Sequence, residues 1–176
     1  MAWTAPRTWT DGELVTKAIM DPHVRDNLKS TMHAEARKTA DQIVNNSTTF
    51  VNDTHLSFAV AANEVWVMTF YLRVVTNATA DIKFEWTYPS GTASVGGVWP
   101  STTLTLTDLS MAASASPLTA LSMGVASSTD VLVVIPLHFI NGVTAGTFQL
   151  RWAQNTANVS DTKLLTGSCI IAARVT

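Results

Sequence analysis

Most of the chain after residue 43 alternates apolar and polar side chains with the period of a β-strand. Residues 81–88 show this most clearly, in the run Ile82-Lys83-Phe84-Glu85-Trp86-Thr87-Tyr88. A strand of this kind has one face in the core and one in solvent. Residues 148–152 repeat the pattern, and 168–175 repeat it with Cys169 expected in the core. About eight such segments follow one another, which predicts a mostly β protein, an antiparallel jelly-roll-like β-sandwich.

Two segments are apolar on both faces, namely 65–75 and 131–139. An outer face of this kind is rarely left bare, so we expect a cover for it. A partner subunit is the simplest cover, and the alternative is the Ser-, Thr-, Ala- and Gly-rich segment 89–129. Pro136 interrupts the second segment, which predicts a sheet edge or a bulge at that point.

Turn signals divide the remaining strands. The run Asn52-Asp53-Thr54 predicts a turn between short strands at 48–51 and 56–60, and Asn141-Gly142 predicts a hairpin-type turn. Further strands are expected near 104–106 and 123–125.

The first 42 residues differ from the rest, because they carry 12 of the 24 charged side chains. We interpret 1–42 as an N-terminal attachment arm and 43–176 as the β-sandwich. Asp11-Gly12 predicts a turn, and Thr16 is the expected N-cap of a helical turn over 17–20. Asp21-Pro22 should end that turn and begin a second helix, with Val24, Leu28 and Met32 along one side. Residues 33–42 are rich in helix formers and are expected to extend the helix or to form a linker.

The arm also carries a recognisable pattern, Trp-x-x-Gly-Glu-x-Val-Thr-x-Ala-x-Met-x-x-x-Val-Arg-Asp-Asn-Leu, over residues 9–28. It resembles the N-terminal signature of small virion proteins of tailed bacteriophages, described as minor tail, fibre or head-surface proteins. Lys17 and Asp21 depart from the Ala and Asn of that signature. The resemblance implies a virion structural protein, and such appendages are commonly homotrimers of jelly-roll-like domains.

These features together predict a homotrimeric head-surface protein, of the decoration or head-fibre type, bound to the major capsid protein. A minor tail or tail-fibre component bound to a tail protein is the alternative. The side chains expected to grip the particle are apolar and lie in the arm: Trp3, Trp9, Val15, Met20, Val24 and Leu28.

Composition narrows the possible settings. Charged residues make up 14% of the chain, against about 25% in ordinary soluble domains, which favours a surface partly covered by further copies. The net charge of −2 does not favour nucleic acid as a partner. No secretory signal and no apolar run of membrane-spanning length occurs, so we expect assembly into a virion in the host cytoplasm, with no membrane partner.

Candidate chemistry is sparse. The four histidines form no metal-binding spacing, His138 is expected to be a packed or hydrogen-bonded residue, and no nucleophile elbow, phosphate loop or paired carboxylates occur. We therefore expect no catalytic site, no cofactor and no metal. Six tryptophans leave one alternative, a host-surface glycan stacking on Trp99 in an exposed loop. The remaining strand tryptophans are expected in the core or at an interface.

Overall fold

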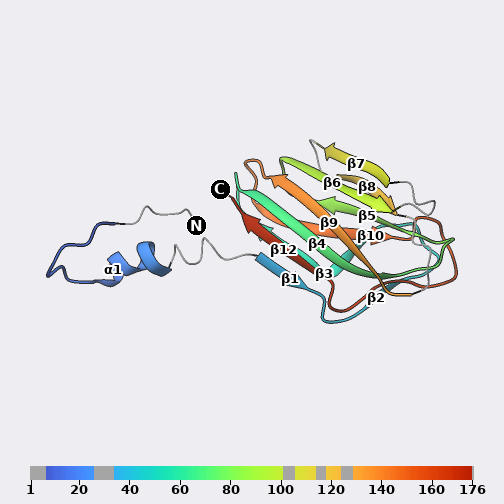
Figure 1. Ribbon diagram of the computed structural model, residues 1–176, viewed down its shortest axis with the longest axis horizontal. Coiled ribbons are helices and arrows are strands. Elements are labelled where there is room, and N and C mark those ends of the chain that lie inside the picture. Colours follow the sequence, from blue (N-terminus) through green and yellow to red (C-terminus); the bar gives the residue numbers. More distant parts are fainter. Residues whose placement is uncertain (1–6, 26–33, 101–105, 114–117, 124–128, 176) are drawn as a thin grey trace.

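Two antiparallel β-sheets pack face to face in this computed structural model, and a short helical segment stands apart from them (Figure 1). The structure describes residues 7–25, 34–100, 106–113, 118–123 and 129–175. The helical segment consists of α1 (Lys17–Met20) and a π-helical turn, η1 (Asp21–Arg25). The predicted fold, a β-sandwich preceded by a short helix, is confirmed.

The described strands are distributed over a large sheet of eight and a small sheet of four. The large sheet contains β1 (Ala34–Arg37), β2 (Gln42–Val44), β4 (Val65–Val75), β6 (Thr92–Pro100), β7 (Leu106–Ala113), β9 (Val131–Ile140), β11 (Thr162–Leu164) and β12 (Cys169–Arg174). The small sheet contains β3 (Val51–Val60), β5 (Ile82–Thr87), β8 (Leu118–Met123) and β10 (Gly146–Ala153).

The strand order is that of a jelly roll with one insertion. The small sheet runs β3-β10-β5-β8 and the centre of the large sheet runs β1-β12-β4-β9. Consecutive strands from β3 to β11 alternate between the sheets, apart from the β6–β7 hairpin, which joins the large sheet beyond β9, and β12 follows β11 within the large sheet. Removing that hairpin leaves β5 followed by β8 within the small sheet, which completes the two Greek keys of the fold.

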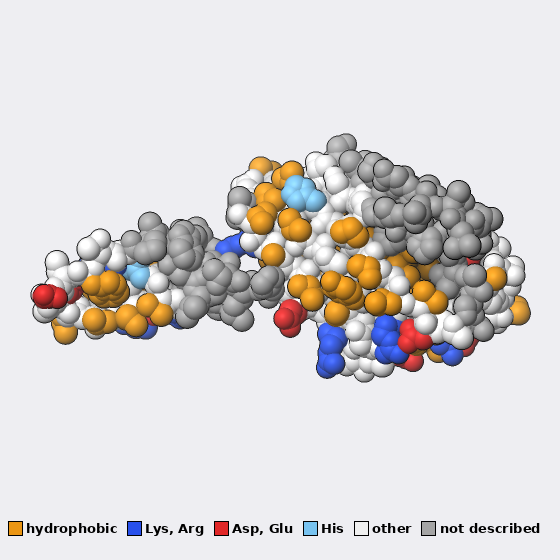
Figure 2. Space-filling model, viewed as in Figure 1, with side chains coloured by type: hydrophobic (Ala, Val, Ile, Leu, Met, Phe, Trp, Pro, Cys, Tyr) orange, Lys and Arg blue, Asp and Glu red, His pale blue; other side chains and the backbone are white. Residues whose placement is uncertain are grey.

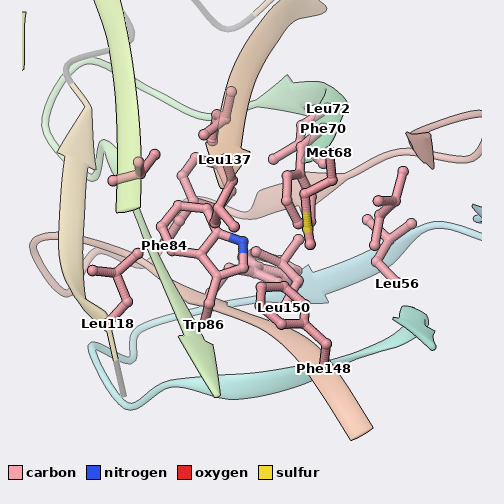
Figure 3. Packing of buried hydrophobic residues seen from close by; sticks show 14 of the residues in the cluster. Leu56, Met68, Phe70, Leu72, Phe84, Trp86, Leu118, Leu137, Phe148 and Leu150 are labelled. Atoms are coloured by element: carbon pink, nitrogen blue, oxygen red, sulfur yellow. The ribbon is translucent and has the colours of Figure 1, made fainter. Parts of the chain in front are cut away.

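The core lies between the sheets, where the alternation of each strand sends its large apolar side chains (Figure 3). Trp86, Phe70 and Phe148 are fully buried. Phe70 lies edge-on to Trp86, with 5.7 Å between ring centroids, a favoured geometry for aromatic pairs. Burying one such side chain contributes about 2–3 kcal/mol, so these contacts hold the two sheets together.

β3 corrects the prediction of two short strands. The Asn52-Asp53-Thr54 run does not separate strands, since β3 is continuous and pairs with β10 on both sides of a register shift. The Asp53 carboxylate accepts hydrogen bonds from the backbone N–H groups of His55 (2.9 Å) and Leu56 (2.8 Å). This is the local bonding expected of an Asp in a turn, and here it shapes a bulge inside a strand.

Residues 34–37 correct the predicted helix extension or linker. They form β1, which pairs with β12 from Ala34 opposite Ala172 to Arg37 opposite Cys169. Ala36 faces the core while Glu35 and Arg37 face outward, so tertiary pairing overrides the helix propensity of these residues. The next residue, Lys38, is fully buried and its ammonium lies 2.6 Å from Asp53. The sandwich therefore starts before residue 43.

The predictions made at Pro136 and at Asn141-Gly142 have different outcomes. Pro136 pairs with Thr69 of β4, but β6 pairs with β9 only over residues 137–140. Pro136 thus lies where β9 loses its described neighbour on that side, as the edge prediction requires. The predicted hairpin at Asn141-Gly142 is wrong, because it connects β9 of the large sheet to β10 of the small sheet.

Candidate attachment segment and contact face

The N-terminal segment 7–25 has a folded local structure. Asp11-Gly12 forms the predicted turn, with Gly12 at a φ of +75° that suits glycine. The Glu13 N–H donates to the Thr10 carbonyl across this turn at 3.1 Å. Arg7 pairs with the Glu13 carboxylate and lies 5.2 Å from the ring centroid of Trp9. The Arg7–Glu13 ion pair thus connects the two ends of the loop that precedes α1.

The helical part continues through the position where a break was predicted. Thr16 precedes α1, and its carbonyl accepts the N–H groups of Ile19 (3.1 Å) and Met20 (3.0 Å). Asp21 remains helical, with φ −56° and ψ −55°, and Pro22 lies in the π-helical turn η1. The helical turn over 17–20 therefore continues into a π-turn, which is wider than an α-helical turn, and no separate second helix begins at Asp21.

Charges in this helical part also pair internally. The Asp21 carboxylate contacts Lys17 and lies 3.0 Å from the guanidinium of Arg25. No residue of α1 or η1 is buried. The charged groups therefore satisfy one another while apolar side chains remain available for a partner.

The structure shows how exposed most of the predicted gripping residues are, while their role in attachment stays a prediction. Four of them are described, and all are partly or mostly exposed: Trp9 (46%), Val15 (55%), Met20 (38%) and Val24 (39%). Trp3 and Leu28 lie outside the described residues. The structure adds Leu14, which is 78% exposed and was not among the predicted residues.

A second surface lies on the outside of the large sheet. We call it the apolar outer face and define it by side chains of β4, β9 and β12: Val67, Tyr71, Val134, Pro136, Cys169 and Ile171. These strands are adjacent, with Tyr71 opposite both Val134 and Cys169. Apolar side chains gather across the middle of this face in Figure 2, with acidic and basic ones along its lower margin.

The described parts of segment 89–129 do not cover this face. β6 and β7 extend the large sheet sideways, and β8 belongs to the small sheet. Val67 remains 49% exposed, Val134 40% and Ile171 45%. The predicted pair of strands with two apolar faces is thus present, and its outer side is open among the described residues.

Cys169 and His138 lie on this side of the sheet and not in the core. Ile170 and Ala172 take the core positions of β12, so Cys169 faces outward, contrary to the prediction. Partial burial raises the pKa of the Cys169 thiol, the Glu35 carboxylate raises it further, and Arg37 opposes them. His138 is exposed on β9, which contradicts the packed form of its prediction, while the hydrogen-bonded form stays a prediction.

The remaining candidates from the sequence are metal-binding groups, membrane-spanning helices and the tryptophans. The described residues hold no group of three or more His, Cys, Asp or Glu side chains arranged to bind a metal. None of their helices has the length and apolarity to cross a membrane. Trp66, Trp86 and Trp152 are core residues, as expected. Trp99 lies in β6 opposite Thr107, and not in the loop that the glycan hypothesis assumed, while its side chain is outside the described part.

Comparisons with known proteins give weak structural likeness only. No family model matches the chain, and no curated protein matches it. The tripod (BppUct-A-L) from the baseplate of bacteriophage Tuc2009 is similar over 98% of this chain and 75% of that one, with 11% identity and a TM-score of 0.29.

Two further solved structures are each similar to about four fifths of this chain. A CocE/NonD family hydrolase from Staphylococcus aureus matches 82% of this chain and 37% of its own, at 10% identity and a TM-score of 0.33. The VP2 subviral particle of infectious bursal disease virus matches 81% and 39%, at 10% identity and a TM-score of 0.26. This chain therefore spans well under half the length of these two proteins, and the functional argument rests on its own residues.

Proposed function

We propose that this chain is a structural protein of a tailed-phage virion, located on the head surface and attached through its N-terminal segment. The observation that carries the proposal is the separate helical segment of residues 17–25, whose charged side chains pair with one another while Met20 and Val24 stay exposed. The virion signature over residues 9–28 coincides with this segment.

The physical properties of the segment suit docking. A helix of nine residues is too short to be stable in water without tertiary contacts. Packing Val15, Met20 and Val24 into a groove supplies those contacts and contributes about 25 cal/mol for each Å² of apolar surface removed from water. Trp9 is the largest exposed side chain of the segment, and a tryptophan of this kind is a typical interface anchor.

The expected partners follow from this role. The segment binds the major capsid protein, and further copies of the chain associate into a trimer through the sandwich. A minor tail or tail-fibre location would use the same segment against a tail protein, and an image of labelled particles separates the two locations. Neither role requires a catalytic site, a cofactor or a metal, and none is proposed.

The test begins with purified particles of the phage that encodes the chain. Peptides of this chain are expected in them at many copies per particle. A complementing Val15→Asp/Met20→Asp variant should be folded and associated as the wild type, yet be absent from particles.

Val143→Asp is the matched control, because Val143 is 83% exposed and belongs to the sandwich. It should be incorporated at the wild-type level. Equal incorporation of both variants would contradict attachment through the segment, and particles without the chain would contradict the virion role itself.

A further inference from the structure

The two outer faces of the sandwich have opposite characters. On the small sheet, the outward positions of β5 and β10 hold Lys83, Glu85 and Arg151, and Arg151 lies 2.6 Å from the Glu85 carboxylate. Lys83 and Arg151 also lie over the ring of Phe50. The outer face of the small sheet thus carries charged side chains that pair with one another and lie against an aromatic ring.

On the large sheet, the equivalent positions form the apolar outer face. Its central rows run across three strands without a charged side chain, from Cys169 through Tyr71 to Val134 and from Ile171 through Thr69 to Pro136. The same chain in the same solvent thus keeps one outer face polar and the other apolar. A face that stays in solvent is expected to carry polar side chains, whereas a face that contacts a partner can be apolar.

The margin of this face indicates what the partner is. β1 borders it with two exposed residues of opposite charge, Glu35 beside Ile171 and Arg37 beside Cys169. A pair of opposite charges two residues apart on one strand is complementary to the same pair on another copy, with Glu35 of each facing Arg37 of the next.

We propose that the apolar outer face is the surface through which copies of this chain associate with one another. The inference deepens the proposed function, because a trimeric virion protein needs a self-contact, but its test uses the purified full-length chain and no particles. A failed particle experiment therefore leaves this surface standing, and a failed association experiment leaves the attachment segment standing.

Light scattering and sedimentation of the wild-type chain, of 18.9 kDa, should give a mass of two or more chains. Val134→Lys puts a charge into the middle of the face and should weaken association on the order of a hundredfold. Thr147→Lys puts the same residue at an exposed position of β10 on the other sheet and should leave association unchanged.

Charge exchange on β1 identifies the partner as a second copy. Glu35→Arg and Arg37→Glu should each weaken association, because like charges then face each other across the contact. The double variant E35R/R37E should restore it, since the two charges have only changed places. A different protein as partner would not be recovered by the double variant, because its own charges are unchanged.

Cys169 gives an independent readout, as the chain's single cysteine lies within the face. Its alkylation rate at fixed pH should fall as the protein concentration rises, and Val134→Lys should abolish that fall. A wild-type chain that stays a single chain at all concentrations would overturn the proposal. Identical behaviour of Val134→Lys and Thr147→Lys would overturn it as well.

Discussion

Breaking the ion pair between Lys38 and Asp53 should destabilise the sandwich more than any exposed charge change. Both side chains are fully buried, with 2.6 Å between the Lys38 Nζ and the Asp53 Oδ2. The other carboxylate oxygen accepts the N–H groups of His55 and Leu56. The backbone of Lys38 is tied as well, since its N–H donates to Ser168 at 2.8 Å and its carbonyl accepts from Gly167 at 3.0 Å.

The magnitude follows from what each variant leaves behind. Lys38→Met leaves a buried carboxylate that keeps its two backbone donors, and Asp53→Asn leaves a buried ammonium beside a neutral amide. Removing one partner of a buried pair costs about 3–5 kcal/mol. For a chain of 176 residues, that corresponds to a fall in Tm of roughly 10 °C. The double variant K38M/D53N buries no charge at this point and should lie within about 2 kcal/mol of the wild type.

Urea unfolding followed by tryptophan fluorescence measures these differences, because Trp86 and Trp152 are fully buried. The dependence of unfolding free energy on urea should keep the same slope in all variants, so that midpoints report stability. The double variant should be more stable than either single variant. If its loss equals the sum of the two single losses, the two side chains are not coupled and the reasoning is refuted.

Three further predictions concern single positions. Burial raises the pKa of Glu64, but hydrogen bonds from the Ala61 N–H, Arg174 and Trp66 outweigh it and hold the pKa below 4.5. The folded chain should therefore lose stability as the pH falls through 4.5 and below, and Glu64→Gln should flatten that loss in acid denaturation while reducing stability at neutral pH. Gly91→Ala should cost about 3 kcal/mol in urea unfolding, because Gly91 has a φ of +92° and a Cβ would meet the Ile140 carbonyl at 2.0 Å. Gly96→Ala, with open space around it, should be neutral, and equal losses would contradict the steric argument. If the glycan alternative holds for Trp99, Trp99→Ala should abolish binding to a host-glycan array without changing oligomeric state, and unaltered binding would remove that role from Trp99.

The long strands could be predicted because each carries enough alternating residues to specify its own face. β4, β5, β9 and β10 all lie where the pattern placed them. Short or glycine-rich strands could not be predicted, since β1 has four residues of good helix propensity and β6 contains Gly96 and Gly97. Their conformation comes from pairing with β12 and β9, which are remote in sequence.

The sequence showed where the backbone forms local hydrogen bonds, but not which strands or turns those bonds belong to. Asp53 does bind backbone N–H groups just after itself, as in a turn, yet β10 continues past it and turns the signal into a bulge. The Asp21-Pro22 signal gave way to a π-turn. The exposed apolar side chains of the N-terminal segment could be predicted from sequence, whereas the extent of the apolar outer face needed the register of three strands.

The position of β12 sets the order in which the molecule can be completed during synthesis. This last strand lies between β1 and β4, which are made far earlier. A ribosome adds about 5–20 residues per second. For several seconds, therefore, β4 is out of the exit tunnel while β12 has not yet been made. Pairing across so much of the sequence is slow, and β12 cannot take its place between β1 and β4 until its own residues have left the exit tunnel. β1 is thus made before the other described strands, but it gains its partner β12 only after all of them have been made.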